Sequence, residues 1–460
     1  MAQSRGNFSG RLGLILASAG SAVGLGNLWR FPTECGNNGG SAFLLVYLLC
    51  VVVFGLPVMV SEFMIGRSSR VSVGRAYEVL APGTPWKWTG RMQVLTPLLI
   101  LCFYNVVAGW TLWYTGAAAI NTFPAMADGG KDAFEGFFAG FVGSWWKQGL
   151  CLVVFSLLTH WVIVQGVSKG IERASKLLMP GLFLLLLLLV GSAMFMPGTA
   201  AGLSFLFKPD FTKIDSGVVL SAMGQAFFSL SLGMGILTTY ASYFRDDADL
   251  GKSALSVCII DTLVALLCGM FIFPTVFTAG IEPSEGPGLL FVALPGVFQE
   301  AFGGQPVLSY AVSLCFFVLL VLATLTSAIS VHEAITSYAA EAFRLSRRTA
   351  ARWVTAITTT LGMLCALSLG AGAQWLTWWD KPMFDWFDFV TAKWMLPLAG
   401  FFISVYAGWF LSKRVWWTQM TNSGTRRFPF FGVFFFMARW VCPIGILLVF
   451  LNELGLLKLL

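Results

Sequence analysis

Residues 11–32 read RLGLILASAGSAVGLGNLWRFP, an apolar stretch long enough to cross a membrane but interrupted near its middle by Gly24-Leu25-Gly26. A second apolar stretch, residues 217–243, is interrupted in the same way around Gly233-Met234-Gly235. A helix broken at bilayer depth is tolerated only where its exposed backbone lines a protein cavity. Two breaks in corresponding positions of two halves are typical of the binding site of a secondary transporter.

The composition identifies a membrane protein, because 57% of the 460 residues are hydrophobic, 11% are charged, and the mean hydropathy is +0.78. No water-soluble domain of this length has these values. The apolar runs predict an all-α protein with eleven membrane-spanning helices, at residues 12–35, 41–66, 90–120, 148–165, 170–196, 216–243, 253–279, 306–341, 352–372, 386–411 and 430–453.

The net charge of +7 reports membrane topology and does not indicate a nucleic-acid partner. If the N-terminus is cytoplasmic, most Lys and Arg residues fall in inter-span segments on the cytoplasmic side, as the positive-inside rule requires. With an odd number of spans, the C-terminus then lies outside. We expect a multi-pass protein of the inner (plasma) membrane, in contact with the lipid bilayer.

The chain is expected to form one membrane transport domain, residues 1–460, built from two repeats. The first five-helix repeat covers residues 11–196 and the second covers residues 216–411, and each begins with its broken helix; residues 430–453 form an extra helix. Because five is odd, the second repeat enters the membrane from the opposite side, which makes the repeat inverted. Inverted repeats place the binding site near the bilayer midplane.

Each break exposes backbone N–H groups on one side and C=O groups on the other. Such a surface suits a ligand that carries a carboxylate and an ammonium group, and the bare C=O groups also suit a small cation. The alternative is that the Gly and Ser residues only allow close helix packing. Two matched breaks favour the binding site over that alternative.

Seven motifs in chain order carry a resemblance to a known family: RLGLILASAGSAVGLGNLWRFP (11–32), NNGGSAF (37–43), GLPVMVSEFMIGR (55–67), VSKGIERASKLLMP (167–180), GQAFFSLSLGMGILTTYASY (224–243), GPGLLFVALP (286–295) and LTSAIS (325–330). The chain resembles the neurotransmitter:sodium symporter family, in its bacterial amino-acid branch. The resemblance implies the LeuT fold, a five-plus-five inverted repeat in which helices 1 and 6 are unwound.

The resemblance also implies two sodium sites. The first would use Ala22, Asn27, Ser229 and Asp261, and the second would use Gly20, Val23, Ala323, Thr326 and Ser327. All of these supply oxygen ligands, which a hard cation requires. For Thr326 and Ser327 alone, local bonding to the preceding helical turn is the alternative.

An amino-acid substrate follows from Gly24, because monoamine-transporting relatives carry an aspartate at the matching position. The implied substrate site comprises Ser21, Ala22, Leu25, Gly26, Ile100, Tyr104, Phe228, Ser229, Ser231, Met234, Ser327 and Val331. In the family the matching tyrosine hydrogen-bonds the substrate carboxylate. The mostly apolar set indicates hydrophobic substrates, aromatic ones included, because methionine adapts to different shapes.

The matching positions in the family form two gates. Arg30 and Asp388 would form the outer gate, although a static structural ion pair is the alternative. Arg5 and Glu341, near Tyr243, would form the inner gate. Glu62 would support the unwound part of helix 6, while Lys393 has no role that the sequence explains.

Animal relatives carry asparagine at the position of Asp261 and bind chloride nearby, so a fixed carboxylate at this position predicts transport without chloride. We therefore expect sodium-coupled symport of hydrophobic L-amino acids into the cell by alternating access, and no enzymatic activity. The alternatives are a proton-coupled or exchange-type permease of the same fold, and a receptor that binds an amino acid without moving it. The sequence does not decide the oligomeric state.

Overall fold

The computed structural model describes residues 8–280, 288–302, 304–370 and 373–456. Nine helices in these ranges are long and apolar enough to cross a membrane: Ser41–Ser69, Lys87–Ala119, Trp145–Val164, Val167–Ala193, Leu250–Thr278, Pro306–Ala342, Arg347–Ser368, Met383–Phe410 and Phe431–Glu453. The protein is therefore a multi-pass membrane protein, as its composition predicts.

In the first half, helices and short 3-10 or π-helical segments (η) follow in the order α1 (Arg11–Ala22), η1 (Gly26–Arg30), α2 (Phe31–Asn37), α3 (Ser41–Cys50), η2 (Val51–Gly55), α4 (Leu56–Ser69), α5 (Val73–Leu80), α6 (Lys87–Ala119), η3 (Phe123–Gly129), α7 (Gly130–Val142), α8 (Trp145–Val164), η4 (Val167–Glu172), α9 (Arg173–Ala193), α10 (Thr199–Phe207) and η5 (Phe211–Lys213).

The second half contains α11 (Ser216–Ser229), α12 (Ile236–Ala241), α13 (Leu250–Thr278), η6 (Leu289–Ala293), α14 (Leu294–Phe302), α15 (Pro306–Ala342), α16 (Arg347–Ser368), η7 (Gln374–Leu376), α17 (Met383–Phe389), η8 (Val390–Met395), α18 (Leu396–Val405), η9 (Tyr406–Phe410), α19 (Lys413–Thr421), α20 (Phe431–Phe436), η10 (Met437–Val441) and α21 (Cys442–Glu453). Before α17, β1 (Thr377–Trp378) and β2 (Lys381–Pro382) form a short antiparallel hairpin.

Two further spans are broken. The helix Arg11–Ala22 and the helix Gly26–Asn37 form a tenth span, bent by 53° at the break. The helices α11 and α12, separated by residues 230–235, lie at the position of the remaining predicted span. Helices are thus present at all eleven predicted positions, and ten of these positions are long and apolar enough to cross a membrane. The largest shift in a helix start is at the ninth position, where the helix begins at Arg347 and the hydropathy pattern predicted residue 352.

Polar caps begin several helices outside the apolar core of the bundle. Asp215 accepts a hydrogen bond from the Val218 amide at 2.8 Å and starts α11, and Asp249 accepts one from the Lys252 amide at 3.0 Å and starts α13. A capping side chain satisfies one of the backbone donors that a helix N-terminus leaves unpaired. These caps fix where the second broken helix and its neighbour enter the bundle.

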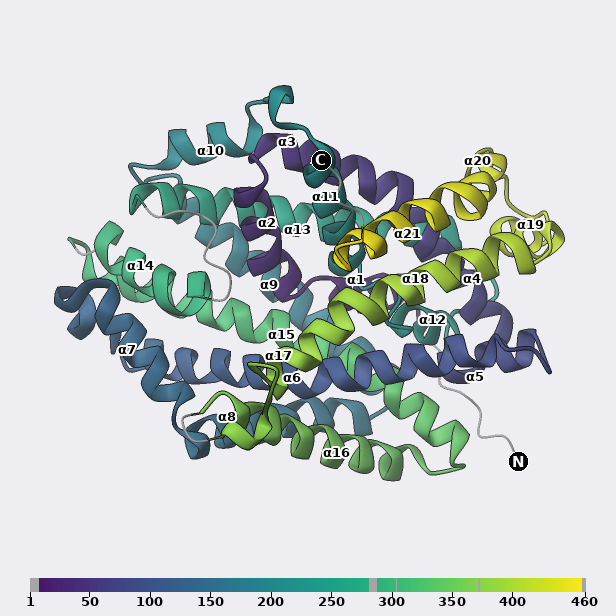
Figure 1. The fold of residues 1–460 in the computed structure, drawn as a ribbon, viewed down its shortest axis with the longest axis horizontal. Helices are drawn as coiled ribbons and strands as arrows, with labels where there is room; N and C mark the ends of the chain where they lie inside the picture. Colours follow the sequence, from purple (N-terminus) through teal and green to yellow (C-terminus); the bar gives the residue numbers. More distant parts are fainter. Residues whose placement is uncertain (1–7, 281–287, 303, 371–372, 457–460) are drawn as a thin grey trace.

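The two breaks contact each other in the middle of the bundle. The Ser231 hydroxyl donates a hydrogen bond to the Ser21 carbonyl at 2.8 Å, and the Asn27 amide donates to the Ser229 hydroxyl at 3.1 Å. In Figure 1, α1 lies at the centre, with α6, α8 and α16 on one side and α11 and α13 on the other. The fold therefore brings two segments about 200 residues apart in the chain to one place.

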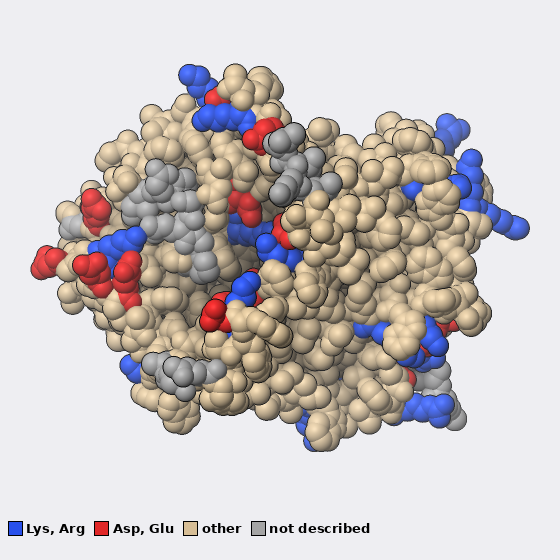
Figure 2. Space-filling view, viewed as in Figure 1, with Lys and Arg blue, Asp and Glu red and all other residues tan. Residues whose placement is uncertain are grey.

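The long helices run between two ends of the molecule, which we name by the elements at each: the α5–α19 end and the α7–α14 end (Figure 1). Figure 2 shows Lys and Arg side chains at the edge of the α5–α19 end, next to a broad surface without charged side chains. This distribution is the one expected of a bundle whose uncharged band lies in lipid.

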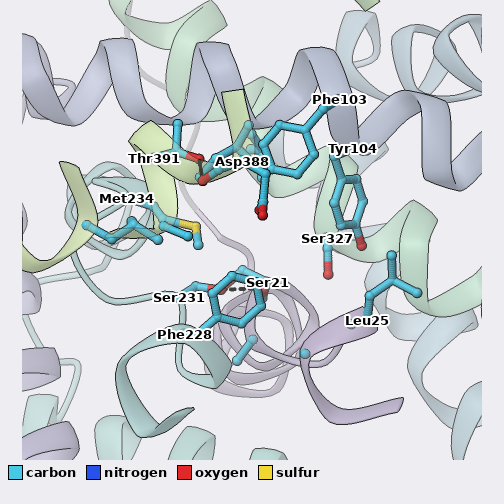
Figure 3. A pocket seen from close by; sticks show the side chains of 17 residues that line it. Ser21, Leu25, Phe103, Tyr104, Phe228, Ser231, Met234, Ser327, Asp388 and Thr391 are labelled. Atoms are coloured by element: carbon cyan, nitrogen blue, oxygen red, sulfur yellow. Dashed lines mark hydrogen bonds between the residues drawn. The ribbon is translucent and has the colours of Figure 1, made fainter. Parts of the chain in front are cut away.

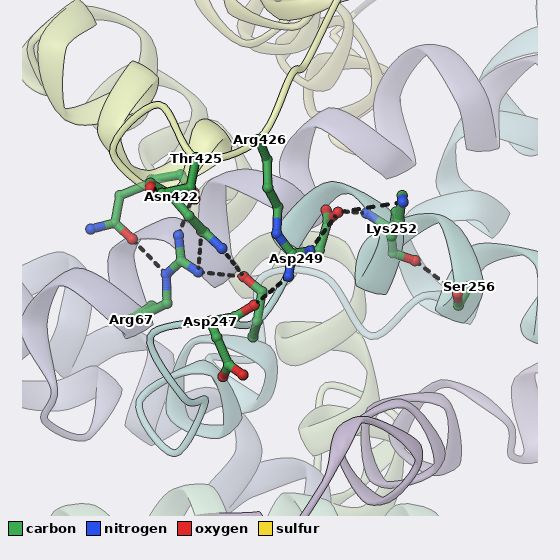
Figure 4. Close-up of polar contacts among 10 residues, drawn as sticks. Arg67, Asp247, Asp249, Lys252, Ser256, Asn422, Thr425 and Arg426 are labelled. Atoms are coloured by element: carbon green, nitrogen blue, oxygen red, sulfur yellow. Dashed lines mark hydrogen bonds and ion pairs between the residues drawn. The ribbon is translucent and has the colours of Figure 1, made fainter.

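A network of hydrogen bonds ties three segments together at the α5–α19 end (Figure 4). Arg67, in the last turn of α4, donates to the Gln419 side chain at 2.6 Å and to the Ala248 carbonyl at 2.6 Å. Arg426 pairs with Asp249 at 3.0 Å. The loop before α13 is thereby fixed to both α4 and the segment after α19.

Candidate functional site

A cavity of about 60 Å³ lies where the two breaks face α6, α15 and the start of the span α17–α18. It is lined by Ser21, Ala22, Gly24, Leu25, Gly26, Ile100, Phe103, Tyr104, Phe228, Ser231, Met234, Ser327, Val331, Asp388, Thr391, Ala392 and Leu396. Figure 3 shows the labelled members of this set around one hollow, with the bond between Ser231 and Ser21 at its floor.

Every residue of the predicted substrate site except Ser229 lines this cavity. The sequence analysis missed Phe103, Thr391, Ala392 and Leu396. A signal existed for three of them, because Phe103 lies three residues after Ile100, and Thr391 and Ala392 lie three and four residues after Asp388, which is the spacing of neighbours on a helix face. Thr391 and Ala392 belong to the π-helical segment η8.

Gly24 has no room for a side chain. A Cβ atom at this position would lie 2.5 Å from the Ser327 hydroxyl and 3.4 Å from the Tyr104 hydroxyl. The backbone of the first break thus approaches α15 and α6 directly. The preceding residue, Val23, is no longer helical: its backbone is extended, with φ −71° and ψ 109°.

The Tyr104 hydroxyl is buried and forms no hydrogen bond of ordinary distance and angle among the described residues; the Ser327 hydroxyl and the Leu25 backbone are its polar neighbours. A buried hydroxyl without a partner costs free energy on the order of 1–3 kcal/mol. It points into the cavity near Ser327 (Figure 3). The site therefore offers an O–H donor that a ligand acceptor would satisfy.

The second break requires left-handed backbone at three positions: Ser231 (φ 54°), Gly233 (φ 82°) and Gly235 (φ 67°). Such angles suit glycine and strain other residues, and the Ser231 bond to Ser21 helps to hold this conformation. Glu62 on α4 supports the same segment, because its carboxylate accepts from the Gly233 amide at 2.8 Å and from the Thr238 hydroxyl at 3.2 Å.

Asn27, Ser229 and Asp261, all from the first predicted sodium site, form one buried cluster. The Asp261 carboxylate accepts from the Asn27 amide at 2.8 Å, from the Ser229 hydroxyl at 2.8 Å and from the Tyr47 hydroxyl at 3.3 Å. Asn27 turns its Nδ2 toward this cluster, and its Oδ1 accepts from the Gly24 amide at 3.1 Å. Burial disfavours the charged form of this carboxylate, while the three hydrogen-bond donors stabilise that form, so the cluster places an acidic group with several oxygen atoms beside the first break.

The oxygens of the second predicted sodium site also meet. The Ser327 hydroxyl donates to the Val23 carbonyl at 3.1 Å, and the Thr326 hydroxyl donates to the Ala323 carbonyl at 3.0 Å. A Cβ atom on Gly20 would lie 3.5 Å from the Thr326 Cβ atom. All five predicted residues are therefore neighbours at the contact of α1 with α15, and the hydroxyls currently bond to carbonyls of the same set.

The outer pair, Arg30 and Asp388, is not in direct contact. Arg30 instead lies 3.7 Å from the carboxylate of Glu34, and its guanidinium carbon lies 4.4 Å from the centre of the Phe228 ring. Among the described residues, no ion pair joins Arg30 to Asp388, whose carboxylate lines the cavity. Glu34 also accepts from the Ser221 hydroxyl on α11 at 2.5 Å. The sequence analysis did not identify Glu34.

At the α5–α19 end, Arg5 lies outside the described residues. Glu341 accepts from the Ser72 hydroxyl at 2.6 Å and from the Ser72 amide at 3.0 Å. The Tyr243 hydroxyl donates to Glu333 at 2.7 Å, and Glu333 is also paired with Arg347 at 2.5 Å. The pair of buried Glu333 and half-buried Arg347 therefore joins α15 to α16 next to Tyr243, and it was not predicted from the sequence.

Lys393, which the sequence could not explain, pairs with Glu453 at the end of α21. Its Nζ lies 3.1 Å from the Glu453 carboxylate and 5.8 Å from the centre of the Phe389 ring. The pair fixes η8, which lines the cavity, to the last span.

Comparisons with known proteins agree with this geometry. The Sodium:neurotransmitter symporter family matches residues 5–127 and 142–458. An uncharacterized sodium-dependent transporter of Bacillus subtilis, YhdH, is 35% identical over 453 residues, covering 98% of each chain. An uncharacterized sodium-dependent transporter of Haemophilus influenzae is 32% identical over 457 residues, again covering 98% of each chain.

Among solved structures, the crystal structure of MhsT in complex with L-phenylalanine superposes with a TM-score of 0.86. That chain is 40% identical, and the match covers 98% of the present chain and all of MhsT. The predicted fold, a bundle of the LeuT type with two unwound helices, is confirmed by this match and by the two breaks. On the extent of the family match and the similarity of the full-length relatives, this chain belongs to the sodium:neurotransmitter symporter family.

Proposed function

We propose that the protein imports hydrophobic L-amino acids, aromatic ones included, by sodium-coupled symport with alternating access. The observation that carries the proposal is the cavity at the contact of the two breaks. It combines a buried Tyr104 hydroxyl that forms no hydrogen bond of ordinary geometry among the described residues, a mostly apolar lining and two adjoining clusters of oxygen atoms. Membership of a family of sodium-dependent transporters supports the coupling ion.

The substrate carboxylate would accept a hydrogen bond from Tyr104 and face the backbone N–H groups near Leu25 and Gly26, at the start of a helical segment. Its ammonium group would face the carbonyl side of the same break. The substrate side chain would lie among Ile100, Phe103 and Met234. The complex of MhsT with L-phenylalanine supports an aromatic substrate of this kind.

The cavity must widen to accept such a substrate. An engineered protein cavity of about 150 Å³ binds benzene, whereas this one measures about 60 Å³. Met234 and Phe228 can move most readily, because methionine has flexible torsions and the Phe228 ring is only half-buried next to Arg30. Closure around the substrate would then follow binding rather than precede it.

One sodium ion would sit between Ala22, Asn27, Ser229 and Asp261, and a second between Gly20, Val23, Ala323, Thr326 and Ser327. A half-turn of the Asn27 amide would present its oxygen to the first ion. The Asp261 carboxylate would supply the negative charge at this site, so we propose that chloride is not needed. Coupling arises because the ions bind one conformation more tightly and so shift its population.

We propose that the protein lies in the plasma membrane and that its α5–α19 end faces the cytoplasm. The N-terminus is then inside the cell and the C-terminus outside. The excess of Lys and Arg at that end supports this orientation. Arg30, Glu34 and Asp388 would then control access from outside. Arg5, Glu341, Tyr243, Glu333 and Arg347 would control access from the cytoplasm.

The test is uptake of radiolabelled leucine, phenylalanine and tryptophan into proteoliposomes with sodium or potassium outside. Accumulation only with a sodium gradient is expected. Equal uptake in potassium would instead identify a proton-coupled or exchange-type permease of the same fold. Saturable binding without accumulation would identify a receptor. The matched substitution for this experiment is Thr326→Val, which removes one proposed sodium ligand.

A further inference from the structure

A mostly apolar groove that holds a few polar side chains opens between α8 and α16, which lie side by side (Figure 1). Its volume is about 350 Å³, and its lining includes Val153, Ser156, His160, Arg352, Thr355 and Thr359. These residues recur at the three- and four-residue spacing of a single helix face on each helix. The groove is separate from the cavity at the helix breaks.

Lipid-facing side chains surround this groove. Trp161 on α8 is 65% exposed and Trp353 on α16 is 61% exposed, and both lie next to the groove residues His160 and Arg352 in the chain. Tryptophan is enriched at the level of the lipid headgroups. The groove therefore begins at the headgroup level of the leaflet nearer the α5–α19 end, because α16 starts at that end.

Arg352 brings a positive charge to the mouth of the groove. Its guanidinium donates only a long bond, 3.4 Å, to the Thr349 hydroxyl, and it has no carboxylate partner among the described residues. Beside it, His160 bonds to the Thr355 hydroxyl at 2.8 Å, and the same hydroxyl bonds to His332 at 2.8 Å. The imidazole of His160 is thus held in place by Thr355, about one helical turn deeper than Arg352.

Deeper in the groove lie two hydroxyls without partners. The Ser156 side chain is 3% exposed, and neither its hydroxyl nor that of Thr359 has a hydrogen-bond partner in the described part of the chain. Ser156 lies four residues before His160 on α8, and Thr359 lies four residues after Thr355 on α16. Because the two helices are antiparallel, both hydroxyls lie about 6 Å from the pair His160–Thr355 in the same direction, toward the bilayer centre. Donors at this depth need an acceptor that lipid tails do not provide.

We propose that this groove binds one anionic phospholipid of the leaflet at the α5–α19 end. The phosphate lies between Arg352 and His160, and the ester carbonyls, which a glycerol unit places below the phosphate, accept from Thr359 and Ser156. One acyl chain then follows the apolar wall at Val153. An ion pair with the phosphate neutralises Arg352, and attraction of basic groups to anionic lipid is general at membrane surfaces.

The experiment is native mass spectrometry of the protein purified from vesicles that contain equal amounts of phosphatidylglycerol and phosphatidylcholine. The variants are Arg352→Gln, Arg348→Gln and the double variant Ser156→Ala/Thr359→Val. Arg348→Gln is the matched control for Arg352→Gln, because Arg348 is the second residue of the same helix. Thermal unfolding in detergent confirms that each variant is folded. Free glycerol 3-phosphate is added as a competitor in a parallel sample.

The wild-type protein is expected to retain one phosphatidylglycerol at least ten times more often than phosphatidylcholine. Arg352→Gln should abolish this preference, Arg348→Gln should keep it, and the double variant should lower retention of both lipids because both carry ester carbonyls. Equal loss of the phosphatidylglycerol preference in Arg348→Gln would overturn the proposal, because the preference would then come from the positive charge of the surface in general. Displacement by glycerol 3-phosphate, or full retention in the double variant, would equally overturn it.

Discussion

The hydroxyl of Ser327 on α15 donates a hydrogen bond to the carbonyl of Val23, 304 residues away in the chain, at 3.1 Å. This bond joins the first helix break to the long helix that faces it. Both oxygen atoms belong to the second proposed sodium site. This bond holds the first break against α15, and a sodium ion that binds both oxygen atoms would replace it.

Removing a proposed sodium ligand next to this bond should raise the sodium requirement. In Thr326→Val the hydroxyl is lost while the shape is retained, so the sodium concentration for half-maximal leucine uptake should rise about ten-fold, equivalent to about 1.4 kcal/mol. Thr324→Val is the matched control, because the Thr324 hydroxyl bonds only to carbonyls of its own helix, at 2.9 and 3.1 Å. An unchanged sodium requirement in Thr326→Val would contradict the assignment of this site.

Substitution of Tyr104 by phenylalanine should weaken substrate binding without harming the fold. The hydroxyl forms no hydrogen bond of ordinary geometry among the described residues, so its loss removes only weak contacts with Ser327 and the Leu25 backbone. A hydrogen bond to a charged group contributes about 1.5–3 kcal/mol, so the dissociation constant for leucine should rise at least ten-fold in Tyr104→Phe. Equilibrium binding of radiolabelled leucine and the melting temperature measure the two effects.

The matched control is Tyr114→Phe. Tyr114 lies on the same helix, and its buried hydroxyl also lacks a partner in the described ranges, but the residue does not line the cavity. Leucine binding should be unchanged in this variant. Equal weakening in both variants would show that loss of a buried hydroxyl disturbs α6 in general, and would refute a specific role for Tyr104.

Glu34 should set how readily the outer gate closes. Its carboxylate lies 3.7 Å from Arg30, and in Glu34→Gln the arginine loses this partner and becomes available to Asp388. Both side chains of the present pair are about 30% exposed, so the pair contributes at most about 1 kcal/mol. We expect leucine to bind up to five times more tightly and turnover to slow, because the closed state gains population.

Two further variants separate this explanation from a structural one. The double variant Glu34→Gln/Asp388→Asn should lose the gain in affinity, because Arg30 then has neither partner. Asp385→Asn, which removes a carboxylate one turn before Asp388, should leave affinity unchanged. Weaker leucine binding in Glu34→Gln would count against competition between the two carboxylates.

The sequence predicted the spans and the cavity well because both depend on strong local signals. Apolar runs of membrane length and glycine pairs at mid-span identify α1 and α11–α12 directly, and the family motifs identify most of the lining. Thr391 and Ala392 have a local signal in their spacing from Asp388, but that spacing does not show which face of η8 points to the breaks. The register of η8 against the two breaks brings them to the cavity.

Long-range ion pairs were harder to predict. Glu333 was hidden in an apolar helix, and its partner Arg347 looked like an ordinary charge at a helix start. Lys393 pairs with Glu453, 60 residues later, and no pattern within either segment indicates the other. Arg30 has two carboxylates within reach, and composition could not decide that it lies beside Glu34 and away from Asp388.

Asp261 should determine whether transport needs chloride. Its carboxylate accepts from the Ser229 hydroxyl at 2.8 Å and from the Tyr47 hydroxyl at 3.3 Å. In Asp261→Asn the negative charge is lost while these two donors remain, so they would face an uncharged amide. A small anion between them could then restore both the charge and the acceptor, as charged acceptors bind such donors more strongly than neutral ones.

We therefore expect wild-type leucine uptake to be unchanged when gluconate replaces chloride, and uptake by Asp261→Asn to fall at least ten-fold under the same replacement. Asp249→Asn, which changes the same chemical group at the α5–α19 end, should show no response to chloride. If the wild-type protein itself needs chloride, the carboxylate does not supply the charge at the first sodium site. If Asp261→Asn is inactive in both anions while its melting temperature is preserved, the carboxylate is needed as a sodium ligand and chloride cannot replace it.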